Sequence, residues 1–436
     1  MTKYYNTQGF KQQNALFFWS LLSPIHLLLV GVIFNVLSTA ADFATTTTKT
    51  KVLVVGASGR VGGSALRSLL SRSKTDPTLN LEVTAAGRSI EKWNSYASNY
   101  KIPDNVRFES VDIGVTSQEL DEIVAQYDLI IHTAGPFQQL KENILLKTSA
   151  KLGKKYIDVL DDVELSRICR GEEYQKLCRS TGASAVISTG IWPGCSSLFA
   201  QKIIAEAGGH EEVESVIFSF HTAGSGGAGP TILTATFLIL GEDVLVYKDG
   251  KKMYYPTATA PRYADFGEVI GSREVIRLNL IECESCAISG IKNVETFFGT
   301  APPIWNTLFS LMGLIPKSIL QNRDLMAKFA LFSLPMVYLI DKMVGSANGI
   351  RVDVTTKKGL TYTGLLTHDD LEQSVGDAIC SFAVQSLKNK IKPGIYFPEE
   401  VEEESFGREI LDEISRSALT YSVRKRVMDS KFDFTL

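Results

Sequence analysis

Three glycines stand where a nucleotide phosphate could be bound. Gly56, Gly59 and Gly62 follow the apolar run 52–55 at G-x-x-G-x-x-G spacing, and a helical apolar pattern comes after them. A strand, a glycine-rich turn and a helix form a dinucleotide site, because the glycines permit close backbone approach and the helix N-terminus attracts phosphate. A glycine-rich turn without a ligand is the alternative. The predicted cofactor contacts in the turn are Gly56, Ser58, Gly59, Arg60, Val61 and Gly62.

The residues after the second predicted strand, 81–86, indicate which dinucleotide binds. NAD sites usually place an acidic residue here to bind the ribose 2′-hydroxyl, whereas this chain has Arg88 and Ser89. A guanidinium and a hydroxyl suit a 2′-phosphate, so we expect NADP and regard NAD as the less favoured cofactor. The site is completed, at the ends of later strands, by Asp112, Ala134, Gly135 and Pro136.

The proton donor of a redox reaction is not evident from residue spacing. His132, Asp158 and His221 each end a predicted strand and are catalytic candidates, although a histidine that shapes a turn or an aspartate that caps a helix has the same pattern. Tyr-x-x-x-Lys pairs, which short-chain dehydrogenases use, occur only far beyond the expected position and are interpreted as coincidences. The lone C-x-x-C at Cys283 and Cys286 is interpreted as ordinary strand residues, and no metal site is predicted.

Alternating strand and helix patterns position the cofactor residues. Repeated βαβ units predict an α/β, Rossmann-type domain with a parallel sheet, helices on both faces and a ligand at the carboxyl ends of the strands. Its strands are expected at 51–55, 81–86, 106–111, 128–132, 155–158 and 183–188.

A second domain is expected from about residue 212. Alternating runs, including 213–221 and 274–286, and a D-G turn at Asp249–Gly250 predict an α+β domain with a largely antiparallel sheet. A last amphipathic helix is expected at 371–387 and a basic tail at 424–431. The expected division is a targeting or anchor segment at 1–49, a nucleotide-binding domain at 50–195, a substrate or dimerisation domain at 196–390 and a C-terminal extension at 391–436.

The N-terminus has the features of a signal. Lys3 and Lys11 precede the apolar run 15–37, and the small residues 38–40 suit a signal peptidase. The next residues, 41–44, resemble the cleavage region of bipartite plastid presequences. We expect an address to the secretory route or a plastid; because the run is long enough to span a bilayer, an uncleaved anchor in the endomembrane system is the alternative.

An apolar segment at 302–344 is the other unusual feature. Its most apolar part, 329–340, is too short to span a membrane. A buried or homodimer-interface helix pair is the first interpretation, and a surface that contacts lipid or encloses an apolar substrate is the second. The formal net charge of −3 gives no footprint for nucleic acid, so no nucleic-acid partner is expected. The expected partner is a small-molecule substrate.

Taken together, these motifs resemble the saccharopine dehydrogenase-like oxidoreductases. The similarity lies in residues 56–62, 87–88, 132–137, 156–158, 193–194 and 392–400. It implies an NADP-dependent oxidoreductase whose substrate is amino-acid-like, polyamine or lipid-linked. Asp161 and Asp162 stand near the position where the family commonly has Gly-Glu, so either could replace that glutamate. No residues match the lysine and histidine of saccharopine-cleaving enzymes, so saccharopine chemistry is not implied.

The sequence therefore predicts an NADP(H)-dependent oxidoreductase. The first domain would hold the nucleotide, and the second would close over the substrate and exclude water during hydride transfer. The alternative is a catalytically inactive NADP-binding module that regulates assembly or membrane association.

Overall fold

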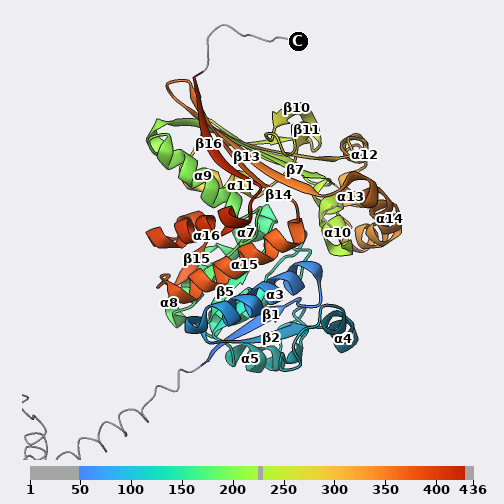
Figure 1. Ribbon diagram of the computed structural model, residues 1–436, viewed down its shortest axis with the longest axis vertical. Helices are drawn as coiled ribbons and strands as arrows, with labels where there is room; N and C mark the ends of the chain where they lie inside the picture. Colours follow the sequence, from blue (N-terminus) through green and yellow to red (C-terminus); the bar gives the residue numbers. More distant parts are fainter. Residues whose placement is uncertain (1–48, 224–228, 428–436) are drawn as a thin grey trace, which may run out of the picture. The chain divides into compact units, whose positions relative to one another are not determined.

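The computed structural model describes residues 49–223 and 229–427 (Figure 1). The predicted signal or anchor at 15–37, most of the glycine-rich loop at 224–228 and the end of the tail at 428–436 lie outside the described residues. From Thr50 onward the chain forms one compact unit. Within the described ranges, no helix is long and apolar enough to cross a membrane.

A parallel sheet forms the nucleotide-binding domain and confirms the predicted fold class. Its order is β15-β6-β5-β4-β1-β2-β3, and every neighbouring pair runs parallel. Its strands are β1 (Thr50–Val55), β2 (Leu81–Gly87), β3 (Phe108–Ser110), β4 (Leu129–His132), β5 (Lys155–Asp158), β6 (Ser184–Val186) and β15 (Gly394–Tyr396). β1 lies between β2 and β4, where the strand order reverses, so a ligand crevice is expected at the carboxyl ends of β1 and β4.

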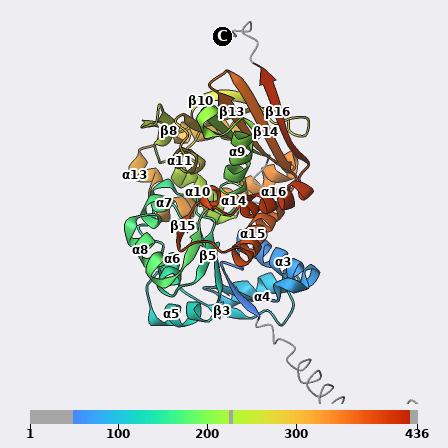
Figure 2. The ribbon, with the colours of Figure 1, turned by 90° about the vertical axis from the view of Figure 1, so that its left-hand side faces the viewer.

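Helices cover both faces of this sheet (Figures 1 and 2). They are α3 (Arg60–Thr75), α4 (Ile90–Asn99), α5 (Gln118–Ala125), α6 (Ile144–Lys151), α7 (Val163–Cys169) and α8 (Glu172–Thr181), with a 3-10 turn η1 (Pro77–Leu79). Ser89, Ser117, Asn143 and Asp162 accept backbone N–H bonds at the N-termini of α4, α5, α6 and α7. These caps satisfy otherwise unpaired N–H groups, so they explain where the helices begin.

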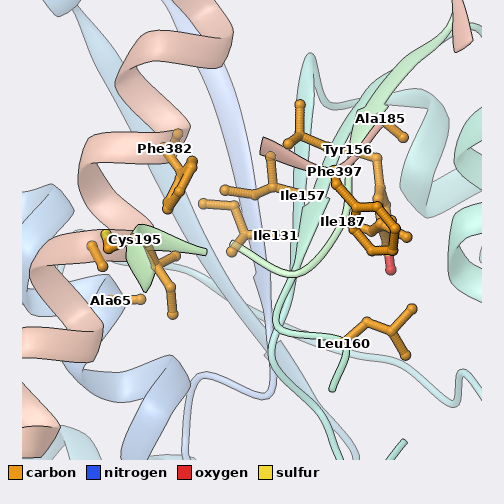
Figure 3. Packing of buried hydrophobic residues seen from close by; sticks show 14 of the residues in the cluster. Ala65, Ile131, Tyr156, Ile157, Leu160, Ala185, Ile187, Cys195, Phe382 and Phe397 are labelled. Atoms are coloured by element: carbon orange, nitrogen blue, oxygen red, sulfur yellow. The ribbon is translucent and has the colours of Figure 1, made fainter. Parts of the chain in front are cut away.

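The chain returns to this domain near its C-terminus, which differs from the expected boundary at residue 390. Helix α15 (Leu371–Lys388) packs along α3, and β15 extends the parallel sheet at β6. Phe382 of α15 lies beside Ile131 and Ile157 in the buried core (Figure 3). The helices cross closely: a Cβ on Gly376 would lie 2.2 Å from Ser64 Oγ. Helix α16 (Glu404–Ser417) packs against α15.

The second sheet is mixed and largely antiparallel, as predicted. Its order is β10-β11-β12-β7-β13-β14-β16, and along it only β12 and β7 pair in parallel. Its strands are β7 (Val213–Ala223), β10 (Thr259–Asp265), β11 (Ser272–Arg277), β12 (Val294–Ala301), β13 (Ala347–Thr356), β14 (Leu360–His368) and β16 (Thr420–Val427). The Asp249–Gly250 turn joins the hairpin of β8 (Val244–Lys248) and β9 (Lys251–Tyr255), also as predicted.

The second domain also contains helices that pack on its sheet and beside it (Figures 1 and 2). They are α9 (Cys195–Glu206), α10 (Pro230–Ile239), α11 (Glu282–Ile288), α12 (Ile304–Met312), α13 (Lys317–Leu320) and α14 (Arg323–Val344), with 3-10 turns η2 (His210–Glu212) and η3 (Pro398–Glu400). The apolar segment 302–344 therefore folds as helices, and α14 packs against α10.

Two local predictions were wrong. The run 274–286 is not one strand, because β11 ends at Arg277 and α11 begins at Glu282, so Cys283 and Cys286 are buried helix residues. Residues 424–427 belong to edge strand β16, which pairs with β14, rather than to a tail. The last helix, in contrast, begins at Leu371 as predicted, and Asp370 caps it.

Candidate functional site

The glycine turn begins with a residue that only glycine suits. Gly56 follows β1 with a φ of +92°, and its N–H donates to the Ala86 carbonyl of β2 at 2.8 Å. A Cβ there would lie 2.8 Å from Thr133 Oγ1 and 2.9 Å from the Ala134 backbone nitrogen. The turn is thus packed tightly against the end of β4, and a side chain would force the two apart.

Two further glycines set the helix on the strand end. Gly59 is the N-cap of α3 with a φ of −84°, a conformation open to any residue, and a Cβ on it would lie 3.1 Å from the Gly56 carbonyl oxygen. A Cβ on Gly62 would lie 2.3 Å from Thr133 Oγ1 and 2.4 Å from that carbonyl. Gly62 therefore allows close packing, whereas Gly59 leaves space at the helix N-terminus. Free N–H groups there suit the pyrophosphate of a dinucleotide.

The end of β2 has an arginine available for a second phosphate. Arg88 is exposed, and within the described part of the chain it has no ion-pair or hydrogen-bond partner. Ser58 Oγ lies 3.8 Å from the position of a Cβ on the neighbouring Gly87, so the glycine turn and this strand end lie together. Ser89, in contrast, caps α4 and donates its hydroxyl to Glu91 at 2.7 Å. The hydroxyl of Ser89 is thus already engaged.

The remaining predicted cofactor residues divide by position. Gly135 and Pro136 line a cavity beside the glycine turn, as does Val61. Arg60 instead pairs its guanidinium Nε with Glu372 of α15 at 3.0 Å, so its side chain is already partly engaged. Asp112 is exposed and accepts the Gly114 N–H at 2.8 Å, as in an ordinary turn. Its contact with adenine stays a prediction, as does that of Ala134.

His132 and Asp158 belong to a buried network and are absent from the cavity lining. His132 Nδ1 and the Tyr156 hydroxyl lie 2.8 Å apart, and this hydroxyl donates to Asp158 Oδ2 at 3.0 Å. The backbone N–H of Ser188 also donates to Asp158, at 2.9 Å, which joins the ends of β5 and β6. Burial lowers the pKa of His132 to about 4 and raises that of Asp158 to about 6. These hydrogen bonds hold the ends of β4, β5 and β6 together, which is a structural role for His132 and Asp158.

His221 is also buried, within β7, and its ring packs against Phe266 with 5.6 Å between centroids. Neither ring nitrogen has a hydrogen-bond partner among residues 49–223 and 229–427. Burial lowers its pKa to about 4, so the ring is neutral at physiological pH. His221 does not line the cavity, so a contact with substrate stays a prediction.

A cavity of about 340 Å³ lies where the two domains meet. The nucleotide-binding domain contributes residues from strand-end loops, and the second domain contributes α10, α12 and α14. Apolar side chains make most of its wall, including Ile191, Trp192, Leu233, Phe237, Leu280, Phe298, Trp305, Phe309, Phe329, Met336 and Val337. Its position beside Gly135 and Pro136 suits a substrate placed against the reactive ring of a nucleotide.

Two acidic residues are the ionisable side chains of this cavity wall: Asp161, after β5, and Glu282, which begins α11. Asp161 was expected only as a substitute for a family glutamate. Glu282 was missed, because it lies in a run that looked like a strand. A Glu at the start of an apolar C-x-x-C helix carries no recognisable motif, so only the tertiary structure brings Glu282 to the cavity.

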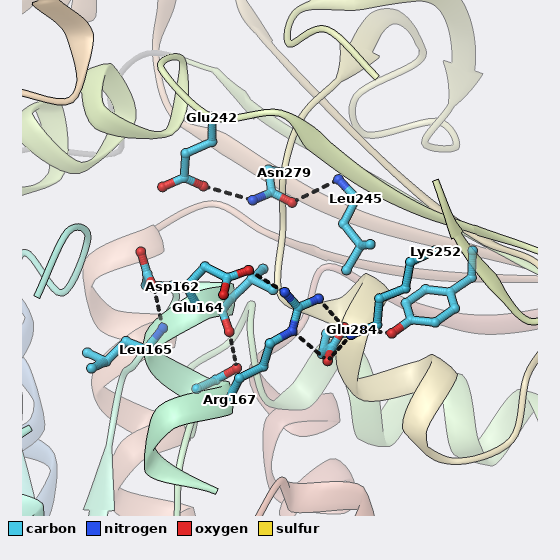
Figure 4. A network of polar contacts seen from close by, with 12 residues as sticks. Asp162, Glu164, Leu165, Arg167, Glu242, Leu245, Lys252, Asn279 and Glu284 are labelled. Atoms are coloured by element: carbon cyan, nitrogen blue, oxygen red, sulfur yellow. Dashed lines mark hydrogen bonds and ion pairs between the residues drawn. The ribbon is translucent and has the colours of Figure 1, made fainter. Parts of the chain in front are cut away.

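An ion pair fixes α11 against the nucleotide-binding domain (Figure 4). Arg167 of α7 binds Glu284 with two parallel contacts, of 2.9 Å and 2.8 Å, and the Tyr247 hydroxyl donates to the same carboxylate at 2.7 Å. Burial alone would raise the pKa of Glu284, but these partners outweigh it and lower the pKa to about 2. The bidentate geometry therefore holds α11, and with it Glu282, in a fixed place.

The chain is similar to a family model and to several solved structures, of which the first described below shares its fold. Residues 52–186 match the family model of the saccharopine dehydrogenase NADP binding domain. Apo saccharopine dehydrogenase (L-Glu forming) from Saccharomyces cerevisiae is similar, with a TM-score of 0.55, 14% identity, and coverage of 86% of this chain and 99% of that one. GenD2 from gentamicin A biosynthesis, in complex with NAD, has a TM-score of 0.38, 12% identity, and coverage of 86% and 94%. Gre2 from Candida albicans, in complex with NADPH, has a TM-score of 0.21, 21% identity, and coverage of 25% and 36%. No curated protein matches the chain.

The match at 52–186 confirms the predicted resemblance and the predicted cofactor, NADP. It also supports an oxidoreductase. At 14% identity, the likeness to the yeast enzyme shows that this chain has a similar fold in both domains, and it does not indicate the substrate of this chain.

Proposed function

Because residues 52–186 belong to the saccharopine dehydrogenase NADP-binding domain family, we propose that this chain transfers hydride between NADP(H) and an apolar, lipid-linked substrate. The observation that carries the proposal is the composition of the cavity wall. The described residues that line it include no lysine, arginine or histidine, so none of them pairs with the carboxylates of an amino-acid-like substrate. Aromatic and aliphatic side chains instead suit a hydrocarbon chain.

The residues of the site divide the work of binding and orientation. The N-terminus of α3 would bind the pyrophosphate, and Arg88 the 2′-phosphate. Gly135 and Pro136 would place the nicotinamide at the cavity, where the reduced ring supplies hydride. Trp305 and Phe309 from the second domain form part of the apolar wall and would keep water from the reacting carbon.

Stopped-flow absorbance of NADPH tests this function. The protein is mixed with NADPH and then with decanal, a long-chain enal or saccharopine. We expect oxidation of NADPH with the two apolar probes and none with saccharopine. Tight NADPH binding without oxidation by any probe would contradict the proposal and favour the inactive NADP-binding module.

We also propose that residues 302–344 contact a lipid surface. Helix α14 presents an apolar stripe to solvent at helical spacing, with Phe332 82% exposed and Met343 80% exposed. Exposed lysines, Lys328 and Lys342, border the stripe and suit anionic headgroups. The stripe consists of Leu325, Phe329, Phe332, Met336, Leu339 and Met343.

Flotation with vesicles of phosphatidylcholine and phosphatidylserine tests this contact. Phe332→Glu should abolish co-flotation, whereas Val115→Glu, at another exposed apolar position that is 58% exposed, should not. Unchanged flotation of Phe332→Glu would contradict the lipid contact. A wild-type dimer in light scattering that becomes monomeric in this variant would instead favour a homodimer interface.

Delivery by the secretory route or to a plastid is part of the proposal. N-terminal sequencing of the native protein tests it: a mature start near Ala41 supports a cleaved signal at 15–37. An intact Met1 on a carbonate-resistant protein would support the membrane anchor.

A further inference from the structure

Asp161 and Glu282 face one cavity from different domains. Asp161 follows β5, at the carboxyl ends of the strands of the first sheet, where the glycine turn also lies. Glu282 begins α11 of the second domain. Among the described residues, the others that line the cavity have no ionisable side chain. These two carboxyls are therefore the acidic groups from which a substrate in the cavity could take a proton.

Neutral hydrogen-bond donors hold both carboxyls. Gln138 Nε2 donates to Asp161 Oδ1 at 2.8 Å. Arg323 at the start of α14 donates to the backbone carbonyls of Gln138 and Pro136. The loop whose Gln138 binds Asp161 therefore also contains Pro136, which borders the predicted cofactor site. Ser196 donates to Glu282 Oε1 at 2.8 Å.

The surroundings of the pair favour its protonated form. Neither carboxylate has a cationic partner within the described ranges, and Glu282 is only 1% exposed. Burial raises the pKa of Asp161 to about 7 and that of Glu282 to about 7. The titratable groups that face the pair are also acidic: Asp158 and Asp162 beside Asp161, Glu242 before β8, and Glu399 beside Glu282. Any negative charge on them raises the pKa values of the pair further.

We propose that Asp161 is the proton donor of the reduction and that Glu282 is a positioning residue that keeps the pair protonated. The assignment rests on the proposed function. As the carbonyl carbon of the substrate accepts hydride from NADPH, its oxygen takes the proton of Asp161. The products are an alcohol, NADP⁺ and the Asp161 carboxylate, which solvent reprotonates when the product leaves. Asp161 is favoured over Glu282 because its loop lies at the cofactor edge of the sheet.

Infrared titration tests the state of Asp161 without turnover. The infrared spectrum of the NADPH-bound wild type, minus that of NADPH-bound Asp161→Asn, should contain the carbonyl stretch of a protonated carboxyl. This band should disappear as pH rises through about 7. No such band at pH 6 would overturn the assignment, because an ionised Asp161 cannot donate a proton. Asp353→Asn is the control, because Asp353 is a buried acid of β13 that pairs with Arg351 and does not line the cavity.

Decanal reduction tests the role itself. Asp161→Asn should lower kcat by about 10²–10⁴-fold while the Kd for NADPH stays unchanged, and Asp161→Glu should restore part of the rate. Glu282→Gln should retain turnover but shift the alkaline limb of the pH profile to lower pH, because a nearby negative charge is lost. Full turnover in Asp161→Asn would overturn the assignment of Asp161 as proton donor but would leave the proposed function intact. A wild type that binds NADPH but reduces no probe would contradict the proposed function, and the assignment with it.

Discussion

Replacing Arg88 with alanine gives a sharp test of how the cofactor is chosen. The guanidinium stands exposed at the end of β2, without a partner among the described residues and close to the glycine turn. It is therefore free to bind the 2′-phosphate that distinguishes NADPH from NADH. Arg107 is a matched control, because this exposed arginine lies next to β3 and already pairs with Glu82 of β2.

The expected effect follows from the exposure of Arg88. A hydrogen bond to a charged group contributes about 1.5–3 kcal/mol, and about 1.4 kcal/mol corresponds to a tenfold change in Kd. Because solvent and salt screen an exposed contact, the lower end of this range applies. We expect Arg88→Ala to raise the Kd for NADPH about tenfold and to leave the Kd for NADH nearly unchanged.

Fluorescence titration of wild type, Arg88→Ala and Arg107→Ala with both nucleotides measures these values. The loss in Arg88→Ala should shrink as salt is raised, while Arg107→Ala should bind both nucleotides like wild type. Equal losses of affinity for NADPH and NADH in Arg88→Ala would show that Arg88 does not bind the 2′-phosphate, because the arginine would then act on a part that the two nucleotides share.

Three further results are expected. Gly62→Ala should lower the melting temperature and weaken NADPH binding at least tenfold, because its Cβ would lie 2.3 Å from Thr133 Oγ1; wild-type affinity in a folded variant would show that this packing does not shape the site. Burial raises the pKa of Glu242 to about 8, so its proton stabilises the fold at low pH, and this contribution is lost as pH rises through about 8. Glu242→Gln should therefore flatten the fall in thermal stability between pH 4.5 and pH 8, and an unchanged fall would contradict the shift. Arg167→Ala should lower the free energy of unfolding at neutral pH by up to about 3–5 kcal/mol, because the buried Glu284 then keeps only Lys252 as an ion-pair partner within the described residues. The loss should be smaller at pH 4.5, where Glu284 of the variant can take up a proton, and equal losses at both pH values would contradict this explanation.

The nucleotide-binding domain was predictable because local chemistry specifies it. The β-branched run 52–55 is wholly buried, as its composition indicates, and the three glycines lie where strand, turn and helix meet. The cofactor choice followed from Arg88, a single residue whose position at the end of β2 is set by counting from the strand.

The parts that failed depend on tertiary contacts. Residues 394–396 have no sequence feature of their own that assigns them to the first sheet, and they join it because β6 has a free edge. Residues 420–427 pair in the same way with β14. The run 274–286 contains apolar and β-branched residues that suit a strand, yet α11 forms because the Arg167–Glu284 ion pair and the packing around Cys283 and Cys286 favour a helix.

The site was predictable only in its cofactor half. His132 and Asp158 end strands, as expected, but their side chains turn into a buried network rather than the cavity. The cavity itself is made by α10, α12 and α14, whose apolar residues have no spacing that separates a substrate wall from an ordinary core.

Transfer of a deuteride label tests whether this chain transfers hydride from NADPH to an apolar substrate. The protein is incubated with NADPH deuterated at the reactive carbon and with a total lipid extract, and the products are examined by mass spectrometry. We predict an apolar product that carries one deuterium, formed by wild type and not by Gly59→Val, in which methyl groups would occupy the space at the N-terminus of α3. Tight binding of NADPH with no label in any product would contradict the account.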